Sequence, residues 1–283
     1  MKQRRLLKDG DALDGQVRLD IRKTFITLTC FILGIGGAVI YGDWSSLVVL
    51  ALIAYGSMFI GVVAYHRLLI HRSFKCSKRL EYSLVFVANF SGMGSPIDLV
   101  KFHELRDWAQ RKDSCHDFFA HRHSLIKDGL EQLFCRIELA KPPEFKIESS
   151  RFYQHMHRYW WSYQIPLGVV LYLVGGWSWV CGGVFLKMFA VQFGHWFVAY
   201  YLHNSGEQPE IIKGAGVQGY NIALLALFTF GESYHNNHHL CPEAAQVGFR
   251  AGQLDPAWWL IRGLEKLDLV CGVVHYQKSS NEH

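Results

Sequence analysis

Three imidazole side chains lie within five residues of one another in the segment Gly-Glu-Ser-Tyr-His-Asn-Asn-His-His at residues 231–239. If this segment is helical, the spacings i, i+3 and i+4 bring His235, His238 and His239 to one face, where neutral ring nitrogens could converge on a cation. Imidazole is a good ligand for iron, zinc, copper and nickel. We interpret the segment as half of a metal site; the alternative is a solvated, histidine-rich turn near a membrane surface.

Further histidines could supply the other half of such a site. His66 and His71 are five residues apart. On an ideal α-helix this spacing turns the two side chains away from each other, so they would serve two metals or two edges of one site. The remaining candidate metal ligands are His103, His116, His121 and His203.

Long uncharged segments surround these histidines. Residues 24–42 and 44–65 carry no charge, and each segment reaches the roughly 20 apolar residues needed to cross a hydrocarbon core. Residues 159–186 are also uncharged, and 188–202 continue the apolar run after Lys187. That run is too long for one span, so it predicts a helical hairpin loosened by glycines. Four transmembrane helices are predicted, at about 24–42, 44–66, 159–176 and 179–203.

The distribution of basic residues predicts the orientation of these helices. With four crossings, both termini share one side with residues 67–158 and 204–283, where Lys and Arg are frequent. The connections at 42–46 and 176–182 contain neither residue type. The positive-inside rule therefore makes the shared side cytoplasmic. All the candidate ligands fall on that side, although they were not used to derive it.

These features define the expected fold and location. The fold class is an all-α integral membrane protein, with residues 1–283 as a single domain and a cytoplasmic helical cap at 67–158 and 204–283 that carries the histidines. The membrane would be a bacterial inner membrane, or the endoplasmic reticulum in a eukaryote. The net charge of +5 needs no nucleic-acid partner, because the basic residues lie where anionic lipid would attract them. Seven scattered cysteines predict neither a disulfide framework nor a thiolate metal site.

The histidine segments resemble those of the membrane-bound, acyl-CoA-type fatty acid desaturases. Residues 66–74, His-Arg-Leu-Leu-Ile-His-Arg-Ser-Phe, resemble the family's first box, H-x-x-x-x-H. Residues 231–239 resemble its third box, G-E-x-x-H-N-x-H-H, with every fixed position present. Residues 196–203 resemble the segment that bears an additional ligand histidine, and Asp-Pro-Ala-Trp-Trp at 255–259 is similar to the C-terminal pattern.

The resemblance implies a function and its cofactors. The expected protein is an O₂-dependent fatty acyl desaturase with two iron ions, acting in the lipid bilayer on an acyl-CoA or another acyl lipid. Iron chemistry is needed because side-chain acids and bases cannot remove hydrogen from an unactivated methylene. The sequence has no haem-attachment motif, flavin fingerprint or cysteine cluster, so electrons would come from a ferredoxin or from a cytochrome b5-like protein with its reductase. The implied metal ligands are His66, His71, His103, His203, His235, His238 and His239.

Two places depart from the family pattern. The second box is H-R-x-H-H, whereas this chain has His103-Glu104-Leu105-Arg106-Asp107, so Arg106 and Asp107 replace two expected histidines. Ala199 replaces an asparagine expected four residues before His203. Asp107 lies four residues after His103, on the same helical face, and is predicted to be a carboxylate ligand. The alternative for Asp107 is a solvated ion pair with a nearby arginine. His116 and His121 are lower-ranked candidate ligands, and the alternative for them is a place in a basic cytoplasmic loop.

Other functions remain open at this stage. A membrane hydroxylase or ketolase with similar histidine boxes would insert oxygen instead of a double bond. A degenerate, non-catalytic desaturase homologue is compatible with the altered second box. A zinc hydrolase is disfavoured because the H-E-x-x-H motif is missing from the sequence.

Overall fold

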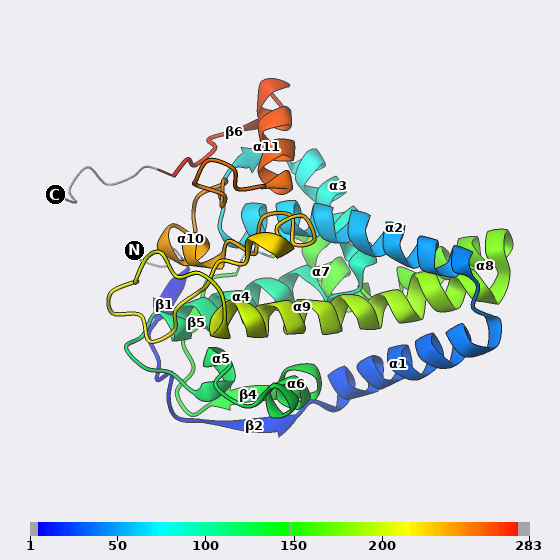
Figure 1. Cartoon of the computed structure of the whole chain (residues 1–283), viewed down its shortest axis with the longest axis horizontal. Helices are drawn as coiled ribbons and strands as arrows, with labels where there is room; N and C mark the ends of the chain where they lie inside the picture. Colours follow the sequence, from blue (N-terminus) through cyan, green and yellow to red (C-terminus); the bar gives the residue numbers. More distant parts are fainter. Residues whose placement is uncertain (1–4, 148, 277–283) are drawn as a thin grey trace.

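A computed structural model describes residues 5–147 and 149–276, which are mostly helical. The long helices α1, α2, α8 and α9 extend toward one end of the molecule, while α10 and most of the strands lie at the other end (Figure 1). In chain order the elements are β1 (Leu6–Lys8), β2 (Gly15–Leu19), α1 (Ile21–Tyr41), α2 (Trp44–Gly61), the π-helix η1 (Val62–Ile70), β3 (Lys75–Cys76), α3 (Lys78–Ala88), η2 (Asn89–Ser91), α4 (Pro96–Gln110), α5 (Asp117–Ala120), α6 (Leu125–Phe134), β4 (Cys135–Leu139), β5 (Glu144–Phe145), α7 (Arg151–Tyr159), α8 (Gln164–Val180), the π-helix η3 (Cys181–Leu186), α9 (Lys187–Asn204), η4 (Ala223–Leu225), α10 (His235–Leu240), α11 (Pro256–Lys266) and β6 (Val270–Cys271).

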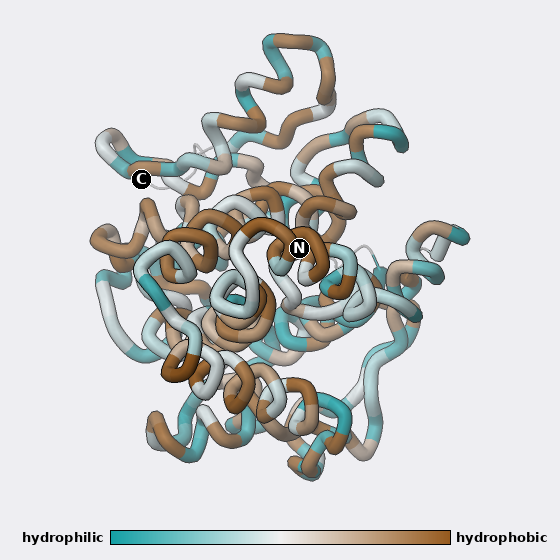
Figure 2. Tube along the Cα trace, turned by 90° about the vertical axis from the view of Figure 1, so that its right-hand side faces the viewer, coloured by the Kyte–Doolittle hydropathy of each residue, from teal (hydrophilic) through white to brown (hydrophobic). Residues whose placement is uncertain are grey.

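Three of the described helical stretches are long and apolar enough to cross a membrane. They are Ile21–Tyr41, Trp44–Ile70 and Gln164–Asn204. Asp20 and Asp43 begin the first two, because each carboxylate accepts a hydrogen bond from the first helical turn. Figure 2 looks toward the ends of these helices, where apolar residues predominate. Val39 is 82% exposed and Leu173 is 78% exposed, which suits contact with lipid rather than water. The chain is therefore a helical membrane protein.

The third stretch folds back on itself at Gly176, as predicted for a hairpin. Gly176 has φ of +63°, in the left-handed region that glycine tolerates. A Cβ atom added to Gly183 would lie 2.6 Å from the side chain of Leu171, and one added to Gly175 would meet the ring of Trp179. These close approaches place the two arms of the hairpin side by side.

Close packing at Gly183 gives a testable expectation. In a Gly183→Ala variant the new methyl group would lie 2.6 Å from Leu171 Cδ1 and 2.9 Å from Val49 Cγ1. Overpacking of this kind costs about 1–3 kcal/mol, more than the gain of up to about 1 kcal/mol in helix propensity. The midpoint of thermal unfolding in detergent should fall. Gly194→Ala is the matched control, because no atom lies within 4 Å of its added Cβ; an equal fall in both variants would contradict the packing argument.

The predicted start of the third transmembrane helix, at residue 159, is wrong. Helix α7 ends at Tyr159, and α8 begins only at Gln164. A turn separates them, and within it the carbonyl of Trp160 accepts a hydrogen bond from Asn89 Nδ2 at 3.0 Å. The start was missed because the turn residues are as apolar as those of the helix that follows.

Helices α3 and α4 form a bent pair, with an angle of 84° between their axes. The chain breaks between them at Gly92, whose φ is +75°, and Ser95 then begins α4 by capping Asp98 N. Backbone carbonyls exposed by the break are bound by polar side chains of the hairpin. Lys187, which is fully buried, donates to the carbonyl of Phe90 and to Gln164 Oε1. The bend directs α4, with His103 and Asp107, toward the other histidines.

The structure adds three small β pairings to the expected all-α fold. Strand β2 pairs with β4, β1 with β5, and β3 with β6, all antiparallel. These strands are two to five residues long and join segments distant in the sequence, so they give no local periodic signal. β5 lies within residues 67–158, the first part of the predicted helical cap. The β1–β5 and β2–β4 pairings fasten the N-terminal segment to the end of the molecule that carries the histidines, and the β3–β6 pairing joins the segment after η1 to the one after α11.

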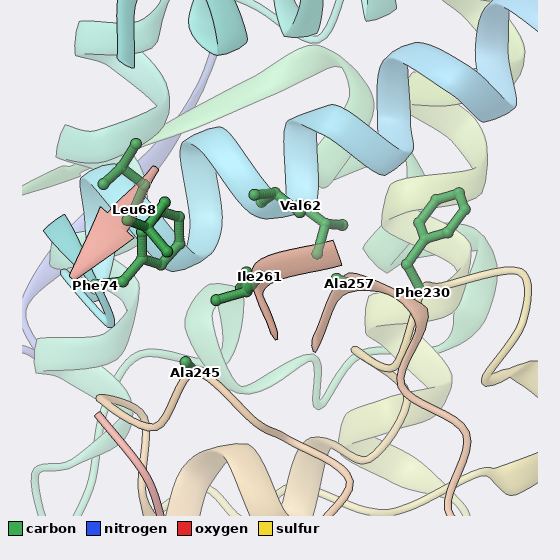
Figure 3. Packing of buried hydrophobic residues seen from close by; sticks show 9 residues of the cluster. Val62, Leu68, Phe74, Phe230, Ala245, Ala257 and Ile261 are labelled. Carbon is green, nitrogen blue, oxygen red and sulfur yellow. The ribbon is translucent and has the colours of Figure 1, made fainter. Parts of the chain in front are cut away.

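A buried apolar cluster fixes the π-helix η1 in place. Side chains from η1, from the loop after it and from α11 contact one another there (Figure 3). The fully buried members include Val63, Phe74 and Ile261. Because His66 and His71 belong to η1 and its C-terminal cap, this cluster sets the position of both imidazoles.

Candidate metal centre

Two groups of histidines converge among the described residues. The four-histidine group comprises His66, His71, His103 and His238. The three-histidine group comprises His203, His235 and His239. Within each group, one ligand nitrogen per residue lies within 4.8 Å of all the others. The seven histidines predicted from the sequence as principal ligands are thus brought together, and they are divided between two positions.

The π-helix explains how His66 and His71 meet. Their Nε2 atoms are 3.1 Å apart, and the amide of His71 donates to the carbonyl of His66. A π-helix forms i to i+5 hydrogen bonds, so residues five apart share a face. The expectation that these side chains turn away from each other is therefore wrong, because it assumed 3.6 residues per turn.

The short helix α10 serves both groups. His235 and His239 point into the three-histidine group, where their Nε2 atoms are 3.1 Å apart. His238 belongs to the four-histidine group, and its ring centroid lies 4.6 Å from that of His71. The expectation that the three imidazoles of this segment converge on one cation is corrected, since α10 lies between the two groups.

The nitrogen spacings match ligands around a common ion. Besides the pairs already given, His203 Nε2 is 3.2 Å from His235 Nε2. Two nitrogens that each bind an ion at about 2.1 Å, at right angles, are about 3.0 Å apart. His203 Nδ1 also lies 2.8 Å from the carbonyl oxygen of Ala199, to which it can donate, which leaves Nε2 to face the group.

A buried carboxylate supports the four-histidine group from outside. Glu232 Oε2 lies 2.9 Å from His66 Nδ1, while Glu232 Oε1 accepts from Arg67 Nε at 2.9 Å. Arg67 is 1% exposed, and its Nη2 lies 2.8 Å from Asp255 Oδ1. Carboxylates that bind the outer nitrogen of a metal-ligating histidine fix the orientation of its ring. Arg67 and Glu232 therefore hold His66 in place.

The three histidines of α10 are held neutral. Burial lowers the pKa of His239 to about 4 and lowers those of His235 and His238 well below their usual value. Burial alone would raise the pKa of Glu232, but His66 and Arg67 lower it to about 2. Neutral imidazoles beside an ionised carboxylate offer free lone pairs at physiological pH, which a bound cation requires.

Asp107 flanks the four-histidine group. Its Oδ1 lies 3.3 Å from His103 Nε2, and its Oδ2 lies 4.0 Å from His71 Nε2. Its side chain is 17% exposed and forms no ion pair within 4.0 Å with Arg106 or Arg111 among the described residues. This position suits the predicted carboxylate ligand better than a solvated ion pair.

His116 and His121 lie outside both groups. His116 caps α5, where its Nδ1 accepts from the amide of Phe118 at 3.1 Å. His121 is buried, and its Nδ1 lies 3.0 Å from Asp128 Oδ1. Its ring stacks on that of His203, with 5.0 Å between the centroids. His121 thus contacts a histidine of the three-histidine group through its ring face.

Comparison with known proteins places the chain in a family. No protein-family model matches it. It is 31% identical to an sn-2 palmitoyl-lipid 9-desaturase of Nostoc sp. (strain 36), over 82% of each chain. The chain belongs to the membrane fatty acid desaturases. The desaturase is also 30% identical to Delta-9 acyl-lipid desaturase 1 of Arabidopsis thaliana, over 90% of this chain and 84% of that one. An acyl-CoA C20 Delta5-desaturase of Anemone leveillei is 27% identical over 84% of this chain and 78% of its own.

The predicted enzyme class is confirmed by these relatives: the desaturase is an oxidoreductase. Sequence reasoning missed some residues that shape its site. Arg67 lies in the histidine segment 66–74 and Glu232 in the segment 231–239, so their closeness in sequence to candidate ligands could have indicated a supporting role. Gln110 and Asp128 were missed because nothing in their local sequence marks them; only the folded chain brings them to the histidines.

Proposed function

We propose that the chain is an O₂-dependent desaturase that introduces a double bond into the acyl chain of a lipid or an acyl-CoA, using iron held by its histidines. The observation that carries the proposal is the convergence of imidazoles from four separate segments into two groups of possible ligands. The Nostoc and Arabidopsis relatives are named for acyl lipids, and the Anemone relative is named for acyl-CoA. Both carrier classes belong to the proposal.

The residues of the four-histidine group fit iron. Imidazole nitrogens with a flanking carboxylate form a donor set that iron accepts. His103 Nε2 is buried and lies 3.3 Å from Asp107 Oδ1, so a cation here would meet an imidazole nitrogen and a carboxylate oxygen side by side. Bound iron would supply the O₂ activation that removal of hydrogen from a methylene needs. Glu232 holds His66, and the carbonyl of Ala199 holds His203, so the chain provides the orientation. Following the family resemblance, we propose two metal positions, one in each group.

The membrane arrangement forms part of the proposal. The four crossings would be α1, α2 with η1, and the two arms of the hairpin broken at Gly176. Residues 67–158 and 204–283 would form the cytoplasmic cap of a single domain, with both termini on that side. The absence of Lys and Arg from the connections at 42–46 and 176–182 supports this orientation. A bacterial inner membrane, or the endoplasmic reticulum, is the proposed location.

An outside protein would deliver the electrons. The sequence carries no flavin fingerprint, haem-attachment motif or cysteine cluster of its own. A ferredoxin, or a cytochrome b5-like protein with its reductase, is the proposed donor.

Product analysis tests the function. The chain is expressed in a bacterial host with a simple lipid profile, beside the empty vector, and total fatty acids are analysed by mass spectrometry. We expect a new acyl species two mass units lighter than a saturated host chain. A species sixteen mass units heavier would indicate hydroxylation and overturn the proposal, as would an unchanged profile when the protein is folded, contains iron and is supplied with a ferredoxin and its reductase.

Epitope accessibility tests the orientation. In intact bacterial spheroplasts, an epitope inserted between Gly42 and Asp43 should bind antibody, because that connection lies on the outer side of the proposed arrangement. An epitope inserted after Pro142 should bind only after the membrane is permeabilised. Both should bind equally in detergent, which controls for epitope exposure. Antibody binding at Pro142 in intact spheroplasts would contradict the four-crossing arrangement.

A further inference from the structure

The two histidine groups have unequal surroundings. The four-histidine group has Asp107 beside it, with a carboxylate oxygen 3.3 Å from His103 Nε2. It can therefore offer four imidazole nitrogens and one carboxylate to a cation. The three-histidine group offers three imidazole nitrogens.

A buried guanidinium lies against His103 and acts on the histidines of both groups. Arg106 is 8% exposed, and its positive charge acts on His203, His235 and His239 as well as on His103; on His239 the negative charge of Asp107 acts more strongly. No carboxylate of the described residues forms an ion pair with it within 4.0 Å. Its Nε has no hydrogen-bond partner, and its Nη2 lies 3.3 Å from His103 Nδ1. Arginine keeps its charge at any relevant pH and cannot act as a ligand. A divalent cation in the three-histidine group would meet a fixed, buried positive charge, which Asp107 opposes only from beyond ion-pair distance.

One nitrogen of the three-histidine group is already occupied. Gln110 Nε2 lies 3.1 Å from His203 Nε2 and 2.7 Å from the carbonyl oxygen of Phe119. The carbonyl oxygen of Phe119 can only accept a hydrogen bond, so the end of the Gln110 amide that faces it must be the NH₂ group. The same NH₂ group therefore points a donor at the lone pair of His203 that a metal would need. Binding a cation there requires this contact to break.

We propose that the two metal positions are unequal: the four-histidine group with Asp107 retains one ion by itself, whereas Arg106 and Gln110 keep the three-histidine group from retaining a second. The inference rests on the proposed metal centre and specifies how many ions that centre retains. Arg106 supplies at the second position the positive charge that an ion would otherwise supply. The chain thus departs from the pair of retained irons that the family resemblance implies.

Cobalt stoichiometry tests the proposal. The full-length protein in lipid nanodiscs is loaded with excess Co²⁺, passed through a desalting column, and analysed for cobalt and protein by mass spectrometry. The unaltered chain should retain about one ion, and Arg106→His, which adds a fourth imidazole and removes the charge, should retain about two. Arg122→His is the matched control, because that arginine is 48% exposed and pairs with Asp117; it should retain about one ion.

A second variant covers the case in which Arg106→His does not fold. Arg106→Gln removes the charge without adding an imidazole, and a second Co²⁺ should then bind at least about tenfold more tightly than in the unaltered chain. Two ions retained by the unaltered chain would overturn the inference, as would a folded Arg106→Gln with no gain in affinity. Failure of the proposed function looks different: the unaltered chain would then retain no ion at all.

Discussion

Replacing His238 with alanine is expected to abolish retention of metal at the four-histidine group and to stop double-bond formation. His238 is the only member of this group from α10, and its ring lies against those of His66 and His71, with centroids 4.8 Å and 4.6 Å away. Even loss of a supporting outer residue typically lowers metal affinity about 10–100-fold, and loss of a direct ligand should lower it further. A hundredfold fall in affinity removes about 2.7 kcal/mol of metal-linked stability.

The measurements for His238→Ala are iron per chain, fatty acid products and the thermal unfolding midpoint with and without iron. His155→Ala is the matched control, because that exposed imidazole contacts only Tyr159 and Tyr163 rings in the described structure. The control should keep its iron and its product. If His238→Ala kept full iron content and product, the four-histidine group could not be the metal position.

Replacing Arg67 with methionine is expected to destabilise the fold by about 3–5 kcal/mol, because it leaves two buried carboxylates without their partner. Arg67 pairs with Glu232 and Asp255, and it also donates to the backbone carbonyls of Ala245 and Phe230. Glu232 would then be held only by His66. We therefore expect both a lower unfolding midpoint and a lower iron content.

Arg18→Met is the control for Arg67→Met. Arg18 lies 3.2 Å from Glu138, but both side chains are well exposed, so the pair should contribute only about 0–1 kcal/mol. Unfolding of the two variants is compared by the loss of helical circular dichroism on heating. Similar midpoints would show that burial of the Arg67 pairs does not matter for stability.

Hydropathy predicted the membrane helices closely where charged residues bound them. The predicted segments 24–42 and 44–66 lie close to α1, which begins at Ile21 after the cap Asp20, and to α2 with η1, which begin after the cap Asp43 and extend to Ile70. The candidate metal-binding segments were predictable for a different reason: imidazoles at short spacing have few structural explanations. Those signals are local, and each can be read from about ten neighbouring residues.

The rest of the site depends on contacts between distant segments. The π-helical register of His66 and His71 has no signature in a hydrophobic pattern that averages over turns of 3.6 residues. The division of His238 from His235 and His239 follows from where α10 lies, and that position is set by buried side chains such as Asn236 and Asn237. The sequence showed that Arg106 and Asp107 were unusual, but only their places in the fold separate a candidate ligand from a competing charge.

The buried lysine at the start of α9 has a consequence for how the chain is assembled. A hairpin inserted alone would carry Lys187 into hydrocarbon with Gln164 Oε1 of its own helix α8 as acceptor; a lysine without compensation there costs roughly 2.5–3.5 kcal/mol. The second acceptor, the carbonyl of Phe90, belongs to a segment synthesised about a hundred residues earlier. Lys187 gains its full set of acceptors in the bilayer only after the bent pair α3–α4 has packed against the hairpin. We therefore expect the bent pair α3–α4 to be in place before α9 reaches its final position, so that the hairpin is the later of the two to assemble.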